Sequence, residues 1–279
     1  LGLAITDEQL DPAFRAQATQ LPSESYLLDR MRPARPQALR AALVRMMRSI
    51  GTQLADELLA LYEQHGVSGE YRFHPADAGR RALRNLALRY LCSAGMAAGW
   101  QRAQQQYAAA GNMTDRMGAL TALVQSACPA REQALTAFRE RYANHSLVLD
   151  KWFALQAGAW RWGDDAAPVL ARVESLLADP AFALTNPNKV YALFGTFFRA
   201  NSAEFHRADG AGYVFWADQV IALDQHNPQV AARMARLLEN WKTLEPALQD
   251  LVRPQLQRVR QYAGISTDVG EIVGKALGE

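Results

Sequence analysis

The stretch that decides the fold class is QALRAALVRMMRSIGTQLADELLAL, which spans Gln37–Leu61. Its apolar residues recur at intervals of mostly three or four positions, as one buried face of an amphipathic α-helix requires. These residues are Leu39, Leu43, Met46, Met47, Ile50, Leu54, Leu58 and Leu61, with Arg40, Arg45 and Arg48 between them. The spacing predicts a helix over this stretch that ends before Gly66.

The same helical period continues along most of the chain. Residues suited to begin a helix precede the apolar runs, at His74-Pro75, Asn112, Asp164-Asp165, Asn186-Pro187, Asn227-Pro228 and Ser266. Helices are therefore expected over Val190–Phe198 and Val230–Trp241, among others. No segment alternates between apolar and polar residues over the length of a strand. The chain is predicted to be all-α, an irregular superhelix formed as an α-solenoid-like stack of antiparallel helix pairs.

One helical domain is expected over residues 1–279. Residues 1–35 are the one stretch where a less regular lead-in is expected, since prolines stand at Pro12, Pro22 and Pro33. The chain begins at Leu1 rather than at a methionine, which indicates an excised fragment or a processed product.

The charge balance argues against a nucleic-acid partner. The chain has 30 basic and 28 acidic residues and a net charge of +2. Six arginines and no acid lie between Asp29 and Asp56, an alternative signal for nucleic acid, but these arginines fall on different helix faces. No membrane segment is expected either. The longest uncharged stretch, Met117–Ala130, is shorter than the roughly 20 apolar residues that a spanning helix needs.

The residue types that usually carry catalysis are sparse and scattered. The five histidines form no HExxH motif, and GxSxG, GxGxxG and GxxxxGK[ST] are absent. Cys92 and Cys128 are too far apart for a CxxC motif and are interpreted as small buried hydrophobes in a reducing compartment, which favours a cytoplasmic location. The aromatic runs Trp152-Phe153 and Tyr213–Trp216 are interpreted as core, with ligand binding as the alternative.

An ordered series of short blocks resembles one known family. The blocks are Leu21-Pro22-Ser23-Glu24, Ala55-Asp56-Glu57-Leu58-Leu59, Arg81-Ala82-Leu83-Arg84-Asn85, Asn112-Met113-Thr114-Asp115, Asp150–Ala157, Asn186-Pro187-Asn188-Lys189-Val190, His206 to Tyr213 and Asn227-Pro228-Gln229-Val230-Ala231. Together they resemble the C-terminal helical domain of bacterial aminopeptidase N, in the M1 family of zinc alanyl aminopeptidases. The resemblance runs over nearly the whole chain.

The resemblance implies a function that composition does not. Family members remove N-terminal residues from peptides, and their zinc ligands lie in an HExxH motif of an upstream catalytic domain. The implied partners of this chain are therefore the upstream catalytic and β domains of the same polypeptide, together with peptide substrates. In the family, the helical C-terminal domain caps the active site and shapes the substrate cavity. The parent enzyme would need zinc, whereas this fragment is expected to bind no cofactor, to contain no catalytic residue and to be inactive alone.

Four residues are candidates for lining that cavity. Gln229 and Arg233 lie one turn apart on a helix that follows Asn227-Pro228, where a guanidinium and an amide suit a carboxylate or a peptide carbonyl. From the residues alone, a solvated polar face is the favoured interpretation; it is the resemblance that implies a place in the cavity lining. The resemblance also implies that Lys189 and Tyr191 line the cavity. At Tyr191 the chain departs from the family, because relatives carry arginine there. The alternative function is a stand-alone α-solenoid that binds a peptide or protein.

Overall fold

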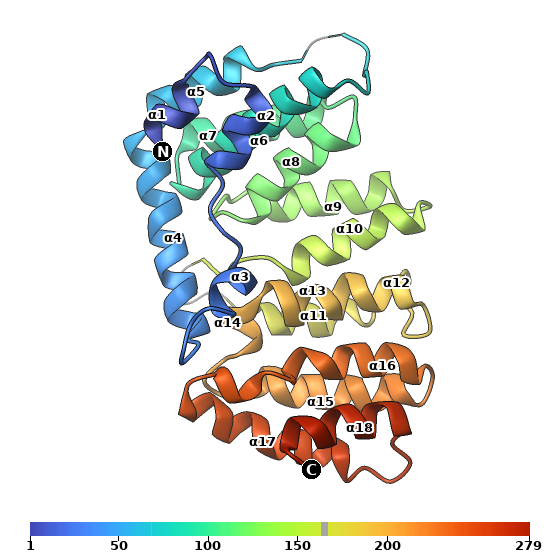
Figure 1. Ribbon diagram of the computed structural model, residues 1–279. Helices are drawn as coiled ribbons and strands as arrows, with labels where there is room; N and C mark the ends of the chain where they lie inside the picture. Colours follow the sequence, from blue (N-terminus) through green and yellow to red (C-terminus); the bar gives the residue numbers. More distant parts are fainter. Residues whose placement is uncertain (68, 163–166) are drawn as a thin grey trace. The chain divides into compact units, whose positions relative to one another are not determined.

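The computed structural model describes residues 1–67, 69–162 and 167–279. In these ranges all regular structure is helical, and the only extended pairing is an isolated parallel bridge between Ala34 and Leu244 (Figure 1). The all-α prediction is therefore confirmed. None of the described helices is long and apolar enough to cross a membrane. The predicted start at Asp164-Asp165 lies outside the described residues.

The chain divides into two compact units. The first contains Leu1–Pro22 and Ala41–Arg141, and the second contains Ser23–Arg40 and Tyr142–Glu279. Residues 1–35 hold three short helices, which are α1 (Gly2–Thr6), α2 (Pro12–Ala18) and α3 (Glu24–Leu28). The extent of the domain, 1–279, stays a prediction.

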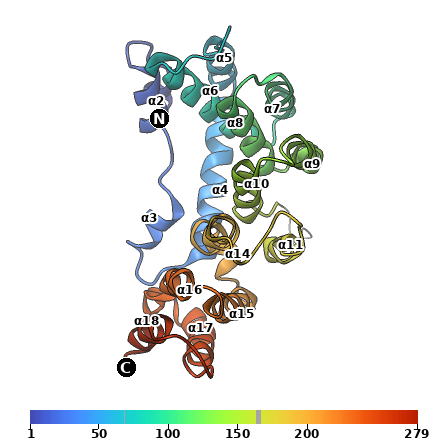
Figure 2. The same cartoon turned by 90° about the vertical axis from the view of Figure 1, so that its right-hand side faces the viewer.

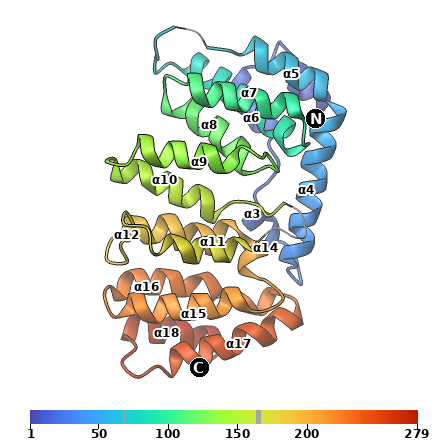
Figure 3. The ribbon, with the colours of Figure 1, turned by 180° about the vertical axis from the view of Figure 1, so that it is seen from behind.

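The first unit is organised around α6. Besides α1 and α2 it contains most of α4 (Pro36–Gln53), together with α5 (Ala55–Gln64), α6 (Pro75–Ser93), α7 (Ala97–Ala109), α8 (Met113–Val124) and α9 (Arg131–Arg141). Helix α6 packs against α2, α5, α7 and α8, and α7 lies beside α8 (Figure 3). Because α6 has neighbours on several sides, Leu83, Ala87, Leu88 and Leu91 are all fully buried. This helix is the hydrophobic centre of the unit.

The helix predicted over Gln37–Leu61 is divided in two at Leu54. The backbone of Leu54 leaves the helical region, with φ −112° and ψ 29°, and α5 begins at the next residue. Near the end of α4, Gly51 lies so close to α6 that an added Cβ would be 2.2 Å from the carbonyl oxygen of Tyr90. Asp56 and Glu57 then stabilise the new helix N-terminus. Apolar spacing continues across the break, so the pattern alone did not reveal it.

The second unit contains the remaining helices. They are α10 (Ser146–Ala157), α11 (Val169–Leu176), α12 (Pro187–Val190), α13 (Thr196–Ala200), α14 (Ser202–Phe205), α15 (Ala211–Asp224), α16 (Pro228–Ala235), α17 (Pro246–Arg260) and α18 (Thr267–Leu277), with a π turn η1 (Tyr191–Gly195) and 3₁₀ turns η2 (Arg236–Leu238) and η3 (Trp241–Thr243). Helix α15 packs on α16 and α17, and α18 packs on α16 and α17 (Figure 2).

The predicted capping residues begin helices in both units. Side-chain oxygens of Asn112, Asn186, Asn227 and Ser266 each accept a backbone N–H of the first turn, at 2.9 to 3.3 Å. Each cap satisfies one of the N–H groups that a helix leaves unpaired at its start. The helix starts at these four positions are confirmed.

The aromatic residues belong to the core of the second unit, as predicted. Phe153, Tyr213 and Trp216 are fully buried, and the rings of Phe194 and Phe215 meet edge-on with centroids 5.6 Å apart. Cys92 and Cys128, in the first unit, are buried free thiols, and burial raises the pKa of both. Both groups of residues therefore act as hydrophobic packing.

His206 lies at the edge of this aromatic core. Its ring packs 4.7 Å from that of Phe205, and its Nδ1 is 2.9 Å from the hydroxyl of Tyr213. Burial lowers the pKa of His206 from 6.5 to about 3. The imidazole is therefore neutral in the folded chain at neutral pH.

This burial predicts loss of stability on acidification. Between pH 6.5 and 3 the unfolded chain holds a proton on His206 that the folded chain lacks, so the free energy of unfolding falls as the pH falls. A full proton difference corresponds to about 1.4 kcal/mol per pH unit. Urea unfolding of the wild type and of His206→Gln at pH 7, 6 and 5 checks this. The variant is expected to lose less stability, by about half that amount between pH 7 and 6 and by nearly all of it between pH 6 and 5, and parallel slopes would contradict the prediction.

Candidate functional site

A hollow on the second unit collects two of the four predicted site residues. Its volume is about 560 Å³, and the residues that line it are Tyr191, Gly195, Thr196, Arg199, Ala200, Arg233, Arg236 and Leu237. They come from two segments, the run η1–α13 and the end of α16 with η2. The site therefore depends on how these two segments are held.

The first segment contains a π turn that the sequence did not predict. A continuous helix was expected over Val190–Phe198, but Tyr191–Gly195 forms a π turn between α12 and α13. On the side away from the hollow, Phe194 and Phe197 are fully buried in the aromatic core. This packing anchors the backbone, while Tyr191 stays partly exposed. Such widened turns are rare in proteins overall, and those that do occur are often found at functional sites.

The second segment is fixed by a buried tryptophan. The indole N–H of Trp216, on α15, donates to the carbonyl oxygen of Met234 at 3.0 Å, and both side chains are fully buried. After Ala235 the backbone tightens into the 3₁₀ turn Arg236–Leu238, so the helix predicted to reach Trp241 is interrupted. The two arginines of this segment, Arg233 and Arg236, remain exposed.

Tyr191 and Arg233 meet across the hollow. The guanidinium Nη1 of Arg233 donates to the hydroxyl of Tyr191 at 2.9 Å, and its Cζ is 5.9 Å from the centre of the ring. The tyrosine supplies a neutral acceptor where relatives were expected to carry a cation. The positive charge of Arg233 is therefore oriented but not neutralised.

Two further arginines belong to the site and were not predicted. Arg199 and Arg236 also line the hollow, and both are exposed. Within the described ranges the guanidinium group of neither arginine takes part in a hydrogen bond or an ion pair. The sequence did hold a signal for them. Arg199 lies two helical turns after Tyr191, and Arg236 lies three residues after Arg233, so extending the same helix faces would have found both.

The other two predicted residues lie elsewhere. The ammonium of Lys189 is buried and donates to Asp150 Oδ1 at 2.5 Å and to the carbonyl oxygen of Ser146 at 2.7 Å, so it joins α12 to α10. Gln229 is exposed in the first turn of α16 and does not line the hollow. The structure thus brings Tyr191 and Arg233 together and separates Lys189 and Gln229 from them.

The electrostatics of the hollow suit an anion. Three guanidinium groups line it, and no carboxylate is among the described residues that line it. Arginine offers a planar fork of donors that matches a carboxylate. The described residues hold no group of three or more histidine, cysteine, aspartate or glutamate side chains that could bind a metal. The three guanidinium groups of the hollow are therefore suited to hydrogen-bond an anion such as a carboxylate.

Comparison with known proteins identifies the family that has this architecture. Residues 1–278 match the family described as DUF3458_C, a domain of unknown function made of ARM repeats. The chain belongs to the DUF3458_C family. This confirms the resemblance noted above, since the match corresponds to the C-terminal ARM-repeat domain of bacterial aminopeptidase N.

Relatives with this DUF3458_C domain are longer proteins. The chain is 40% identical over 279 residues to aminopeptidase N of Caulobacter vibrioides and 35% identical over 273 residues to that of Escherichia coli. The two matches include 100% and 98% of this chain but only 32% and 31% of the length of the relatives. A crystal structure of Legionella pneumophila aminopeptidase A in complex with aspartic acid has a TM-score of 0.88 and 26% identity, covering 99% of this chain and 33% of that one. The chain therefore spans about a third of these proteins.

Proposed function

We propose that this chain is the C-terminal domain of a zinc-dependent M1 aminopeptidase, an enzyme that removes N-terminal residues from peptides. In that polypeptide the domain caps the active site and shapes the substrate cavity, and upstream catalytic and β domains are its partners. The hollow lined by Tyr191, Arg199, Arg233 and Arg236 contacts the carboxyl side of the peptide. The cytoplasmic location expected from the cysteines is part of the same proposal.

One observation carries the peptide-binding part of this proposal. Three arginines line a single hollow that has no described carboxylate in its lining, and one of them is oriented by a neutral tyrosine hydroxyl. Such an arrangement favours a carboxylate, because ionised hydrogen bonds are stronger than neutral ones. The identity to aminopeptidase N along the whole chain supports the enzyme class.

The residues described here do not supply a binding site for the zinc of such an enzyme. None of their histidine, cysteine, aspartate and glutamate side chains gather into a set of three or more that could hold a metal. We therefore assign zinc and the bond chemistry to the upstream domain, and we assign to this chain the binding and orientation of substrate alone.

The experiment uses Arg233→Ala in the intact aminopeptidase polypeptide. Its KM is expected to rise about three- to tenfold for di- and tripeptides with a free C-terminal carboxylate, which corresponds to a partly screened ionic contact. Single-residue chromogenic substrates and C-terminally amidated peptides should be affected little, because they present no carboxylate to the hollow. Steady-state kinetics on the three substrate classes measures this split.

The matched control is Arg258→Ala. Arg258 is also an arginine of the second unit, but it pairs with Asp218 on the surface and does not line the hollow. It should leave all three KM values unchanged. Equal effects of Arg233→Ala on free and amidated peptides would mean that the hollow does not contact the carboxylate.

The stand-alone α-solenoid remains the alternative. A stand-alone binding protein would bind free-carboxylate peptides through the same arginines, but the natural polypeptide that carries it would cleave none of them. Zinc-dependent release of alanine from an alanyl peptide by that polypeptide separates the two functions.

A further inference from the structure

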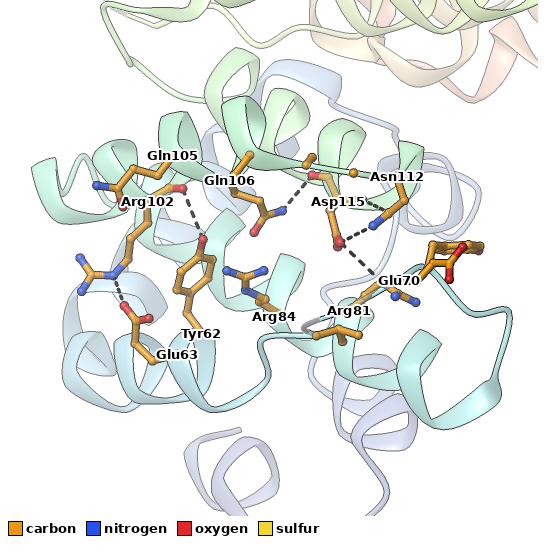
Figure 4. A pocket seen from close by; sticks show the side chains of 16 residues that line it. Tyr62, Glu63, Glu70, Arg81, Arg84, Arg102, Gln105, Gln106, Asn112 and Asp115 are labelled. Atoms are coloured by element: carbon orange, nitrogen blue, oxygen red, sulfur yellow. Dashed lines mark hydrogen bonds and ion pairs between the residues drawn. The ribbon is translucent and has the colours of Figure 1, made fainter.

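A second, more polar pocket lies in the first unit, between α5, α6, α7 and the start of α8 (Figure 4). Its volume is about 750 Å³. Several polar residues that line it are more than nine-tenths buried, among them Arg81, Gln106 and Asp115. Burying polar groups is costly unless each finds a partner, so their partners decide what the pocket can hold.

Two of its three arginines already have carboxylate partners. Arg102 Nε donates to Glu63 at 2.8 Å, and Arg81 Nε is 3.6 Å from Asp115 Oδ2. The Glu63 side chain is 61% exposed, so the pocket opens to solvent beside this pair. These two pairs balance their own charges.

Arg84 is the third arginine, and its charge is not balanced. Its guanidinium lies 4.3 Å from the centre of the Tyr62 ring, and its buried Nε has no hydrogen-bond partner within the described part of the chain. Burial raises the pKa of Tyr62 although the nearby Arg84, which also hydrogen-bonds the phenol, lowers it, so Tyr62 is a neutral neighbour of Arg84 and not a counterion. The remaining carboxylate of the lining, Glu70, is exposed and lies on the far side of Arg81 in Figure 4. Among the residues that the structure describes, Arg84 thus has no carboxylate partner and presents its positive charge to the pocket.

Two acceptors of the same pocket are also unsatisfied. Gln106 Nε2 donates to Asn85 Oδ1 and to the carbonyl oxygen of Asp115, both at 2.8 Å, which fixes the amide orientation. Its Oε1 therefore faces the pocket on the side of Arg84 (Figure 4) and, like Asp115 Oδ1, has no partner among the described residues. A ligand that pairs with the Arg84 guanidinium and also with these acceptor oxygens must carry an anionic group and a hydrogen-bond donor close together.

We propose that this pocket binds the zwitterion of a free α-amino acid, with its carboxylate on Arg84 and its ammonium on Gln106 Oε1 and Asp115 Oδ1. An α-amino acid carries its ammonium and carboxylate groups on the same carbon atom, and the pocket offers a cation and two acceptors that complement them. This site is separate from the arginine hollow of the second unit and does not depend on the function proposed for that hollow.

Isothermal titration calorimetry on the 279-residue chain tests the proposal. Glycine, L-alanine, L-leucine and L-phenylalanine are titrated separately, and at least one should give saturable binding. Propionate lacks the ammonium, ethylamine lacks the carboxylate, and inorganic phosphate is an anion alone. Each of these three should bind at least tenfold more weakly than the tightest amino acid.

Two variants identify the site. Arg84→Gln should weaken amino-acid binding at least tenfold, whereas Arg80→Gln should leave it unchanged. Arg80 is an exposed arginine of the same helix that does not line the pocket, so the control removes the same charge. Circular dichroism verifies that both variants are folded, and the ligand series tests the proposal without any variant.

Three results would overturn the proposal. If none of the four amino acids gives saturable heat, then water alone satisfies the buried polar atoms. If propionate or phosphate binds as tightly as the amino acid, then the two acceptors do not recognise an ammonium. If Arg84→Gln binds like the wild type, then Arg84 does not hold the carboxylate.

Discussion

Replacing Glu24 by glutamine is expected to lower the free energy of unfolding by about 3 kcal/mol or more, because it leaves a buried guanidinium without its counterion. The Glu24 carboxylate accepts from Arg40 and from the hydroxyl of Ser202, the latter at 2.5 Å. Arg40 also donates to Asn201 Oδ1 at 3.1 Å, and Asn201 in turn donates to two backbone carbonyls. Glutamine keeps the shape of Glu24 but removes its charge.

The chain offers an exposed pair as the control. Arg35 and Glu245 are 3.7 Å apart, with side chains 60% and 34% exposed, against 10% and 9% for Arg40 and Glu24. Glu245→Gln should therefore cost less than about 1 kcal/mol, as surface pairs do. Urea unfolding of both variants measures the difference. A loss of less than about 1 kcal/mol for Glu24→Gln would show that Arg40 finds other compensation.

Replacing Gly212 by alanine is expected to destabilise the chain by about 2 to 3 kcal/mol, because α15 packs directly on backbone at this point. An added Cβ would lie 2.1 Å from the carbonyl oxygen of Phe205 and 3.1 Å from its Cα. Backbone cannot rotate away as a flexible side chain can, so the start of α15 must shift. Gly212 is fully packed among residues of the second unit's core.

Gly111→Ala is the matched control, since a Cβ at that position would meet nothing within 4 Å. Both variants restrict the unfolded chain equally, which stabilises the fold by at most about 1 kcal/mol. The difference between their melting temperatures therefore isolates the contact with Phe205. Equal melting temperatures would show that α15 moves at no cost.

The sequence predicted the starts of helices better than their interiors. Asparagine and serine caps act locally, so Asn112 and Ser266 begin helices as expected. The break at Leu54 and the π turn from Tyr191 depend instead on contacts with other helices. Apolar spacing continues through both, because the same face stays buried on either side. Propensity and period contain no information about where a neighbour presses on the backbone.

The candidate site was predictable to the same extent. The helical face carrying Arg233 follows from the sequence, but its contact with Tyr191, 42 residues earlier, requires the packed structure. Lys189 differs from Arg233, because it does not line the hollow. The resemblance implied that Lys189 lines the cavity, whereas its ammonium is buried against Asp150. The helical periodicity of the sequence assigns a residue to one face of its own helix, but it does not identify the residue that it contacts on the next helix.

The π turn also determines how this segment responds to changes in length. A π turn holds one more residue than an α turn, and each residue of an α-helix advances the chain by about 100° around the axis. Deleting one residue within Tyr191–Gly195 would leave an α turn of nearly the same angular span, so the residues before it would keep their orientation relative to α13. The phenol at its start would therefore still lie on the side of Arg233, whereas the same deletion inside a regular helix such as α15 would rotate every preceding residue by about 100°.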